Sequence, residues 1–252
     1  VGAIESDRPS GFTETVRHHD PAGLRWGSMT PAGRHHPLLG KQRLGAGLGD
    51  VLHERRRLMA VYLRKRLHPQ LRELIMLSAA GADSSRQCSF AHRQWAKSVG
   101  VTEEEVVALE HLDFAAFDER RWAAFAWAQA YARNDLGEVP ADVESNFRHH
   151  FTEQEREDIK MAARTMYWLN ETSNSVDAFL SRLRHEPLPR STLTTEIIAL
   201  LLYAIVAPVL FTWLSIRQGY RPIRIFRGMR PFFREFETRG PNTISGPGER
   251  YV

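Results

Sequence analysis

The sequence predicts an all-α protein that ends in a hydrophobic membrane segment and a basic tail. Apolar side chains recur at helical spacing through most of the chain, and no run alternates as a half-buried strand does. Two Thr-x-x-Glu patterns, at 102–105 and 152–155, are typical of the capping boxes that open helices. The stretch 197–216 is twenty residues without a charge, which is long enough to cross a bilayer.

The composition is that of an ordinary globular protein. Of 252 residues, 42% are hydrophobic and 25% are charged, and the formal net charge is +4. We divide the chain into a Pro/Gly/His-rich arm (1–49), a helical domain (50–190), a hydrophobic segment embedded in a membrane (191–216) and an Arg-rich tail (217–252). The single cysteine excludes an internal disulfide and a cysteine-based zinc site, and it fits a reducing compartment.

The arm holds two patterns that invite a ligand. The histidine doublets at 18–19 and 35–36 suggest a metal, but neighbours on an extended chain point opposite ways and no cysteine or acidic cluster accompanies them. The glycines of GAGLG, at 45–49, follow no predicted strand and lack the spacing of a dinucleotide loop. We therefore expect no metal and no cofactor.

The first helix of the domain is expected to begin at Asp50, with a basic face (HERRR, RKR) and an apolar one. His68-Pro69 marks a boundary, because a residue before proline avoids the helical region. Residues 71–80 then predict a central helix, since apolar side chains surround most of it. The turn at 81–83 ends that helix.

The next helix is capped by Ser84 or Ser85 and ends at Gly100. An aromatic and alanine-rich segment predicts a core helix, a short amphipathic helix follows it, and the second capping box opens a long helix toward Leu183. These three helices are expected over residues 119–134, 141–150 and 152–183.

The helix between Ser84 and Gly100 holds the candidate chemistry. Cys88 and His92 are four residues apart, so on a helix the thiol and the imidazole can meet, and the helix N-terminus favours a thiolate with a lowered pKa. Glu73 lies in the apolar run of the central helix, where a carboxylate is costly unless it is paired. The alternatives are a small buried cysteine beside a surface histidine, and a solvated glutamate.

The stretch LRELIMLSAAGADSSRQCSFAHRQWAKSVGVTEEEVVAL resembles the core of the carboxymuconolactone decarboxylase and alkylhydroperoxidase-D-like family. The family pattern is a glutamate on one helix, then C-x-x-C-x-x-x-H on the next. The resemblance assigns Glu73, Cys88 and His92 to the glutamate, the second cysteine and the histidine, and it implies trimers or hexamers. Ser85 stands at the position of the first cysteine, so the dithiol of the peroxidase members is absent.

The resemblance implies a thiol-dependent oxidoreductase in which Cys88 is the nucleophile, His92 its base and Glu73 part of the proton relay. A lone thiol oxidised to a sulfenic acid would need an outside thiol to resolve it. Lactone decarboxylation, the other activity named in the family, needs acid–base groups and no dithiol, and Glu73 and His92 could serve it. The alternative is a non-catalytic accessory subunit of a membrane complex.

The segment 197–216 predicts a membrane helix, with a helix buried at an oligomer interface as the alternative. The arginines after it favour a cytoplasmic tail, and a break at Pro208 would leave both flanks, and so the helical domain, cytoplasmic in a re-entrant dip. We expect membrane lipid, membrane-complex subunits or further copies of the chain as partners, and no nucleic acid, because the arginines line no recognisable binding fold.

Overall fold

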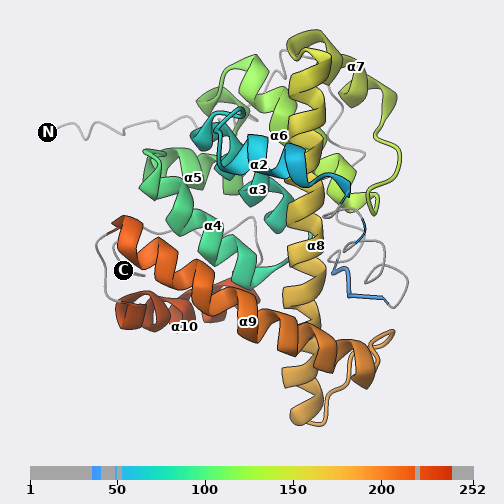
Figure 1. Ribbon diagram of the computed structural model, residues 1–252, viewed down its shortest axis with the longest axis vertical. Coiled ribbons are helices and arrows are strands. Elements are labelled where there is room, and N and C mark those ends of the chain that lie inside the picture. The colour runs from blue at the N-terminus through green and yellow to red at the C-terminus, as the bar shows by residue number, and fades with distance from the viewer. Residues whose placement is uncertain (1–35, 41–48, 50–52, 219–221, 240–252) are drawn as a thin grey trace, which may run out of the picture.

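The computed structural model describes residues 36–40, 49, 53–218 and 222–239, and in this part of the chain it is helical without a strand (Figure 1). The predicted all-α class is therefore confirmed. In chain order the elements are α2 (Arg55–Tyr62), α3 (Pro69–Ala82), α4 (Arg86–Ser98), α5 (Glu103–Glu110), the 3-10 turn η2 (Phe114–Ala116), α6 (Glu119–Arg133), α7 (Ala141–His150), α8 (Glu153–Leu183), α9 (Leu193–Gln218) and α10 (Pro222–Arg239).

Helix α3 is the centre of the domain, and α4, α6 and α8 pack around it. It begins with Pro69 at its first position, where the missing N–H costs nothing, and its apolar residues are buried on almost every side. Helix α6 supplies the alanine-rich surface that lets α3 approach closely. The central and aromatic helices predicted from the sequence are thus both confirmed.

Local capping explains where several helices begin. Thr102 and Glu105 form a capping box at the start of α5, and Thr152 and Glu155 form one at the start of α8. From this second box α8 runs through most of the height of the molecule in Figure 1 and contacts helices from α2 to α9. Both predicted boxes are confirmed.

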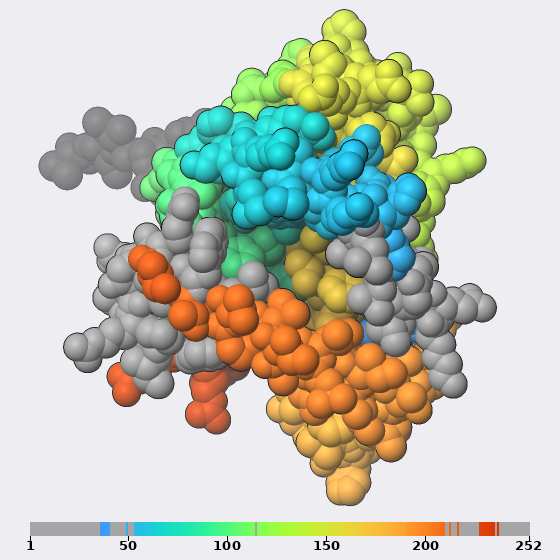
Figure 2. All heavy atoms as spheres, in the orientation of Figure 1, coloured from blue at the N-terminus to red at the C-terminus, as the bar shows by residue number. Residues whose placement is uncertain are grey.

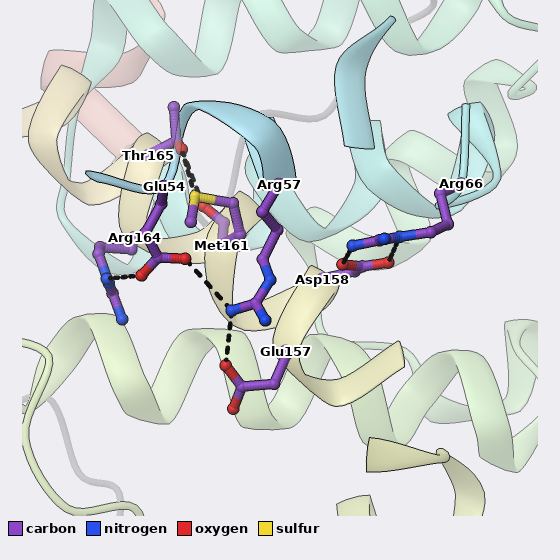
Figure 3. A network of polar contacts seen from close by, with 8 residues as sticks. All are labelled: Glu54, Arg57, Arg66, Glu157, Asp158, Met161, Arg164 and Thr165. Atoms are coloured by element: carbon purple, nitrogen blue, oxygen red, sulfur yellow. Dashed lines mark hydrogen bonds and ion pairs between the residues drawn. The ribbon is translucent and has the colours of Figure 1, made fainter. Parts of the chain in front are cut away.

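A polar network fastens α2 to α8 (Figure 3). Arg57 bonds Glu54 and Glu157 at 3.2 and 3.0 Å, and the carboxylate of Glu54 also accepts Arg164 at 2.8 Å. Arg66, just beyond α2, forms a two-pronged ion pair with a buried carboxylate, that of Asp158 on α8. Part of the basic run predicted to be a charged face therefore pairs with acidic side chains.

Helix α9 corrects the predicted membrane segment. In the described part of the chain no helix is long and apolar enough to cross a membrane. The break expected at Pro208 is not observed, because α9 continues as one helix through it. The apolar run is divided between two faces: Ala199 and Ala207 are buried on the side toward the domain, whereas Leu201 and Ile205 are exposed. Figure 2 shows α9 lying across one face of the molecule.

The ends of the described chain pack on the helical domain in two smaller clusters. The backbone N–H of Leu39 donates to Ser175 on α8 at 2.8 Å, and Asn174 donates to the carbonyl of Pro37 at 3.2 Å. Helix α10 buries Phe232 and Phe236 against α4. The histidine doublet at 18–19, one member of the other doublet, and all of GAGLG but its last glycine lie outside the described residues.

Candidate active site

A buried ion pair joins the first two helices of the predicted site. Glu73 on α3 and His92 on α4 are only 4% and 2% exposed, and His92 Nδ1 lies 2.8 Å from Glu73 Oε2. Arg72 holds the other oxygen of the carboxylate, with Nη2 and Nε at 2.7 and 3.0 Å from Glu73 Oε1. The solvated alternative for Glu73 is therefore wrong, and the cost of burying its charge is offset by two partners.

The charge of Glu73 is favoured despite its burial. Burial raises the pKa of this carboxyl, but the bond to His92, the charge of His92 and the charge and bonds of Arg72 outweigh it, so that the pKa is lowered. The ionised Glu73 accepts the Nδ1 proton of His92, which selects the tautomer protonated at Nδ1 whenever the ring is neutral. The Nε2 atom then carries the lone pair of the ring and is the atom that can take a proton.

The thiolate expected at Cys88 is not supported by its surroundings. Its Sγ lies 3.3 Å from Ser173 Oγ on α8, whereas His92 is turned to Glu73, so the predicted thiol–imidazole pair is replaced by two separate contacts. Burial raises the pKa of the Cys88 thiol to about 11; the Ser173 and Ser85 hydroxyls oppose this, and the carboxylates of Asp83 and Asp177 add to it. The helix N-terminus is thus outweighed by desolvation and nearby negative charge.

Ser85 is buried at the N-cap position of α4, but its side chain makes no capping hydrogen bond. Its Oγ lies 2.6 Å from Ser173 Oγ, and Ser173 donates its own proton to the carbonyl of Asn170 at 3.2 Å. The side chains of Ser85, Ser173 and Cys88 thus form one hydrogen-bonded group. Ser85 therefore lies beside Cys88, as a hydroxyl in place of a second thiol.

An ion pair holds the start of α4 against α8. Arg86 Nε and Nη2 each lie 2.9 Å from one oxygen of Asp177, and Gln87 Nε2 donates to Asp177 Oδ1 at 2.8 Å. This two-pronged geometry orients the first turn of α4. It also fixes which end of the Gln87 amide is engaged.

A pocket lies between α4, α8 and α9, and both Cys88 and His92 line it. It contains about 620 Å3 of empty space counted out to its open mouth. Most of the wall is apolar or aromatic, and α9 closes one side. The lining residues are Gln87, Cys88, Ala91, His92, Trp95, Trp168, Leu169, Thr172, Ser173, Leu202, Tyr203, Val206 and Ala207. An apolar and aromatic lining with a few polar groups is typical of sites for small organic molecules.

The sequence interpretation missed the partners that α3, α8 and α9 bring to the site. Arg72 was detectable as a second charge beside Glu73 in an apolar run. Ser173 lies in the run NETSNS, six polar residues on every side of a helix that is otherwise amphipathic, and this run is buried throughout. Such a run predicts buried polar partners. No local signal marks Trp168 or Tyr203.

In the described part of the chain no group of three histidine, cysteine or carboxylate side chains is arranged to hold a metal ion. The fold and site define a class: a helical protein in which a buried Glu–His pair faces an apolar pocket beside a cysteine. Residues 54–130 match the profile of the Carboxymuconolactone decarboxylase family, which confirms the predicted resemblance over this part of the chain. Neither the curated proteins nor the solved structures compared with the chain gave a match.

Proposed function

We propose that the protein is an acid–base enzyme that moves a proton on a small, largely apolar substrate, with His92 as the base. The observation that carries the proposal is the 2.8 Å contact of His92 Nδ1 with Glu73 Oε2 at the wall of the pocket. Glu73 holds the tautomer that leaves Nε2 free to accept a substrate proton, and its charge stabilises the imidazolium that forms. Returning the proton to the substrate completes the cycle without a cofactor.

The thiol chemistry of the peroxidase reading receives less support. A thiol with a pKa of about 11 is ionised in about one molecule in 10,000 at pH 7, and only the thiolate attacks peroxide. Ser85 offers no second sulfur to close a disulfide. Acid–base chemistry needs neither a thiolate nor a second sulfur, and the Glu73–His92 pair can supply it.

The proposal is tested by deuterium exchange. Cyclic ketones, β-keto esters and enol lactones are incubated with the protein in heavy water, and loss of the proton next to the carbonyl is followed by NMR. We expect His92→Gln to lower the catalysed rate about 100- to 10,000-fold. His149→Gln, on the exposed surface of α7, is the matched control and should leave the rate unchanged.

Two outcomes count against acid–base chemistry. No exchange above the buffer rate with any of these compounds would remove its basis. Turnover of peroxide by the wild type, abolished in Cys88→Ser, would assign the site to thiol chemistry instead.

We also propose that α9 and α10 bring the protein onto an anionic lipid surface. Leu201, Ile205 and Val209 follow one another at intervals of four on α9 and are 61, 70 and 67% exposed. Their burial in a membrane interface is favourable, and exposed arginines on α10, among them Arg227 and Arg230, suit acidic headgroups. The helical domain would then lie at the cytoplasmic leaflet, where anionic lipids are concentrated.

Flotation with vesicles tests the lipid proposal. We expect binding to vesicles of phosphatidylcholine with phosphatidylserine, weaker binding to phosphatidylcholine alone, and loss of binding in Leu201→Ser with Ile205→Ser. Leu183→Ser, an exposed leucine at the end of α8, is the control. Failure to float would refute the lipid proposal. Self-association that the α9 variant abolishes would assign this face to a second copy of the chain.

A further inference from the structure

One wall of the pocket comes from α9, which lies outside the part of the chain that matches the family profile. Leu202, Tyr203, Val206 and Ala207 lie far outside residues 54–130, the part that matches the family profile. These residues place an aliphatic and aromatic surface beside Cys88 and His92. We therefore infer the ligand of the pocket from these side chains and not from the family profile.

Trp168 and Gln87, which line the pocket, each have a buried polar atom with no hydrogen-bond partner among the described residues. One is the indole N–H of Trp168, a donor, and the other is the amide oxygen of Gln87, an acceptor. Gln87 is only 6% exposed, and its amide nitrogen is already used on Asp177. An unpaired buried polar atom costs about 1–3 kcal/mol, so a ligand that pairs these atoms gains that free energy on binding.

Among the described residues, no lysine or arginine lines the pocket. The nearest basic side chains on α3 and α4 are engaged, Arg72 by Glu73 and Arg86 by Asp177. A carboxylate ligand would lose its hydration here without meeting a free cation, which makes its binding unfavourable.

We propose that the pocket beneath α9 binds an uncharged, largely apolar carbonyl compound whose oxygen accepts the indole N–H of Trp168. A hydroxyl on the same ligand can donate to Gln87. The inference rests on the proposed function, since it names the substrate class of the same site. His92 Nε2 takes the proton from the carbon next to the carbonyl, the C–H electron pair shifts to form an enolate, and Trp168 stabilises the negative oxygen until the proton returns.

The proposal is tested by binding of three probes that share a benzene ring. Acetophenone has the carbonyl, ethylbenzene lacks it, and benzoate replaces it with a charge. Dissociation constants with the full chain are measured by ligand-observed NMR. We expect acetophenone to bind about 5- to 10-fold more tightly than ethylbenzene, the worth of one hydrogen bond, and at least about 10-fold more tightly than benzoate.

Trp168→Phe isolates the hydrogen bond, because it keeps a ring in the wall and removes the donor. We expect it to abolish the preference for acetophenone over ethylbenzene while ethylbenzene itself binds within about 3-fold of wild type. Trp122→Phe, a core substitution on α6 outside the pocket, should keep the preference. Thermal unfolding confirms that both variants are folded.

Benzoate binding as tightly as acetophenone, or Trp168→Phe leaving the preference intact, would overturn the ligand class. The proposed function fails separately: if acetophenone binds as expected but its methyl protons exchange no faster than in the His92→Gln variant, the ligand class stands and acid–base catalysis falls. If only charged substrates exchange their protons, acid–base catalysis stands and the proposed ligand class falls.

Discussion

Replacing Glu73 by Gln is the sharpest test of the buried pair. The substitution keeps the shape of the side chain but leaves the Arg72 guanidinium without its carboxylate. Breaking a buried ion pair costs about 3–5 kcal/mol. Arg72 keeps two long contacts, both 3.4 Å, to the carbonyls of Val61 and Tyr62, so we expect the lower end, a loss of about 3 kcal/mol at pH 7.

The lowered pKa of Glu73 determines how the stability difference between wild type and Glu73→Gln should change with pH. Because the pKa of Glu73 is lowered in the folded protein, its contribution to the free energy of unfolding is complete above the ordinary glutamate pKa, about 4.5, and is lost as the pH falls through the lowered value. The gap between wild type and Glu73→Gln should therefore be constant above about pH 5 and narrow below it.

Urea unfolding followed by circular dichroism at several pH values measures this gap. Glu157→Gln is the control, because its ion pair with Arg57 is partly exposed and should contribute no more than about 0.5 kcal/mol. Adding Arg72→Met to Glu73→Gln should recover part of the loss, since it removes the unpaired cation. A loss below about 1 kcal/mol, or a gap that persists unchanged at acid pH, would refute the reasoning.

Three further predictions concern the thiol and the caps. Alkylation of Cys88 by iodoacetamide should still accelerate between pH 9 and about 11, because burial raises its pKa; a plateau near pH 9 would contradict this. Ser85→Cys should close a disulfide with Cys88 under mild oxidation, since both positions contact one Ser173 hydroxyl; two thiols that stay titratable would count against it. Thr102→Ala should lower the free energy of unfolding by about 1 kcal/mol, whereas an unchanged denaturation midpoint would show that the capping box is dispensable.

The parts of the fold that could be predicted are those with local causes. Thr102 and Thr152 start helices because their side chains bond backbone groups three residues away, a signal contained in four letters. The direction of the Cys88 pKa could not be predicted this way. It depends on how tightly α8 and α9 cover the start of α4, and that is a property of the packed molecule.

The same reasoning explains why hydropathy predicted a membrane-spanning helix at 197–216, whereas none long and apolar enough is found in the described part of the chain. Hydropathy counts apolar residues but does not say which neighbour each face of a helix meets, and an all-round apolar helix can be buried by protein as well as by lipid. The pairing of Glu73 with His92 was suggested by the family resemblance. Arg72, which also binds Glu73, could be seen in the sequence only as an adjacent charged residue, and the fold decides which partner its side chain meets.

Helix α9 links the two proposals, because one element supplies both surfaces. Its inner side, with Tyr203 and Ala207, closes the pocket, and its outer side carries Leu201 and Ile205. An apolar carbonyl compound partitions into lipid, so a protein whose pocket lies under a lipid-facing helix would meet its substrate at high local concentration. The outer-face variant should then slow turnover of a vesicle-borne ketone while leaving turnover of the same ketone in solution unchanged; equal slowing of both would mean that α9 acts on the pocket alone.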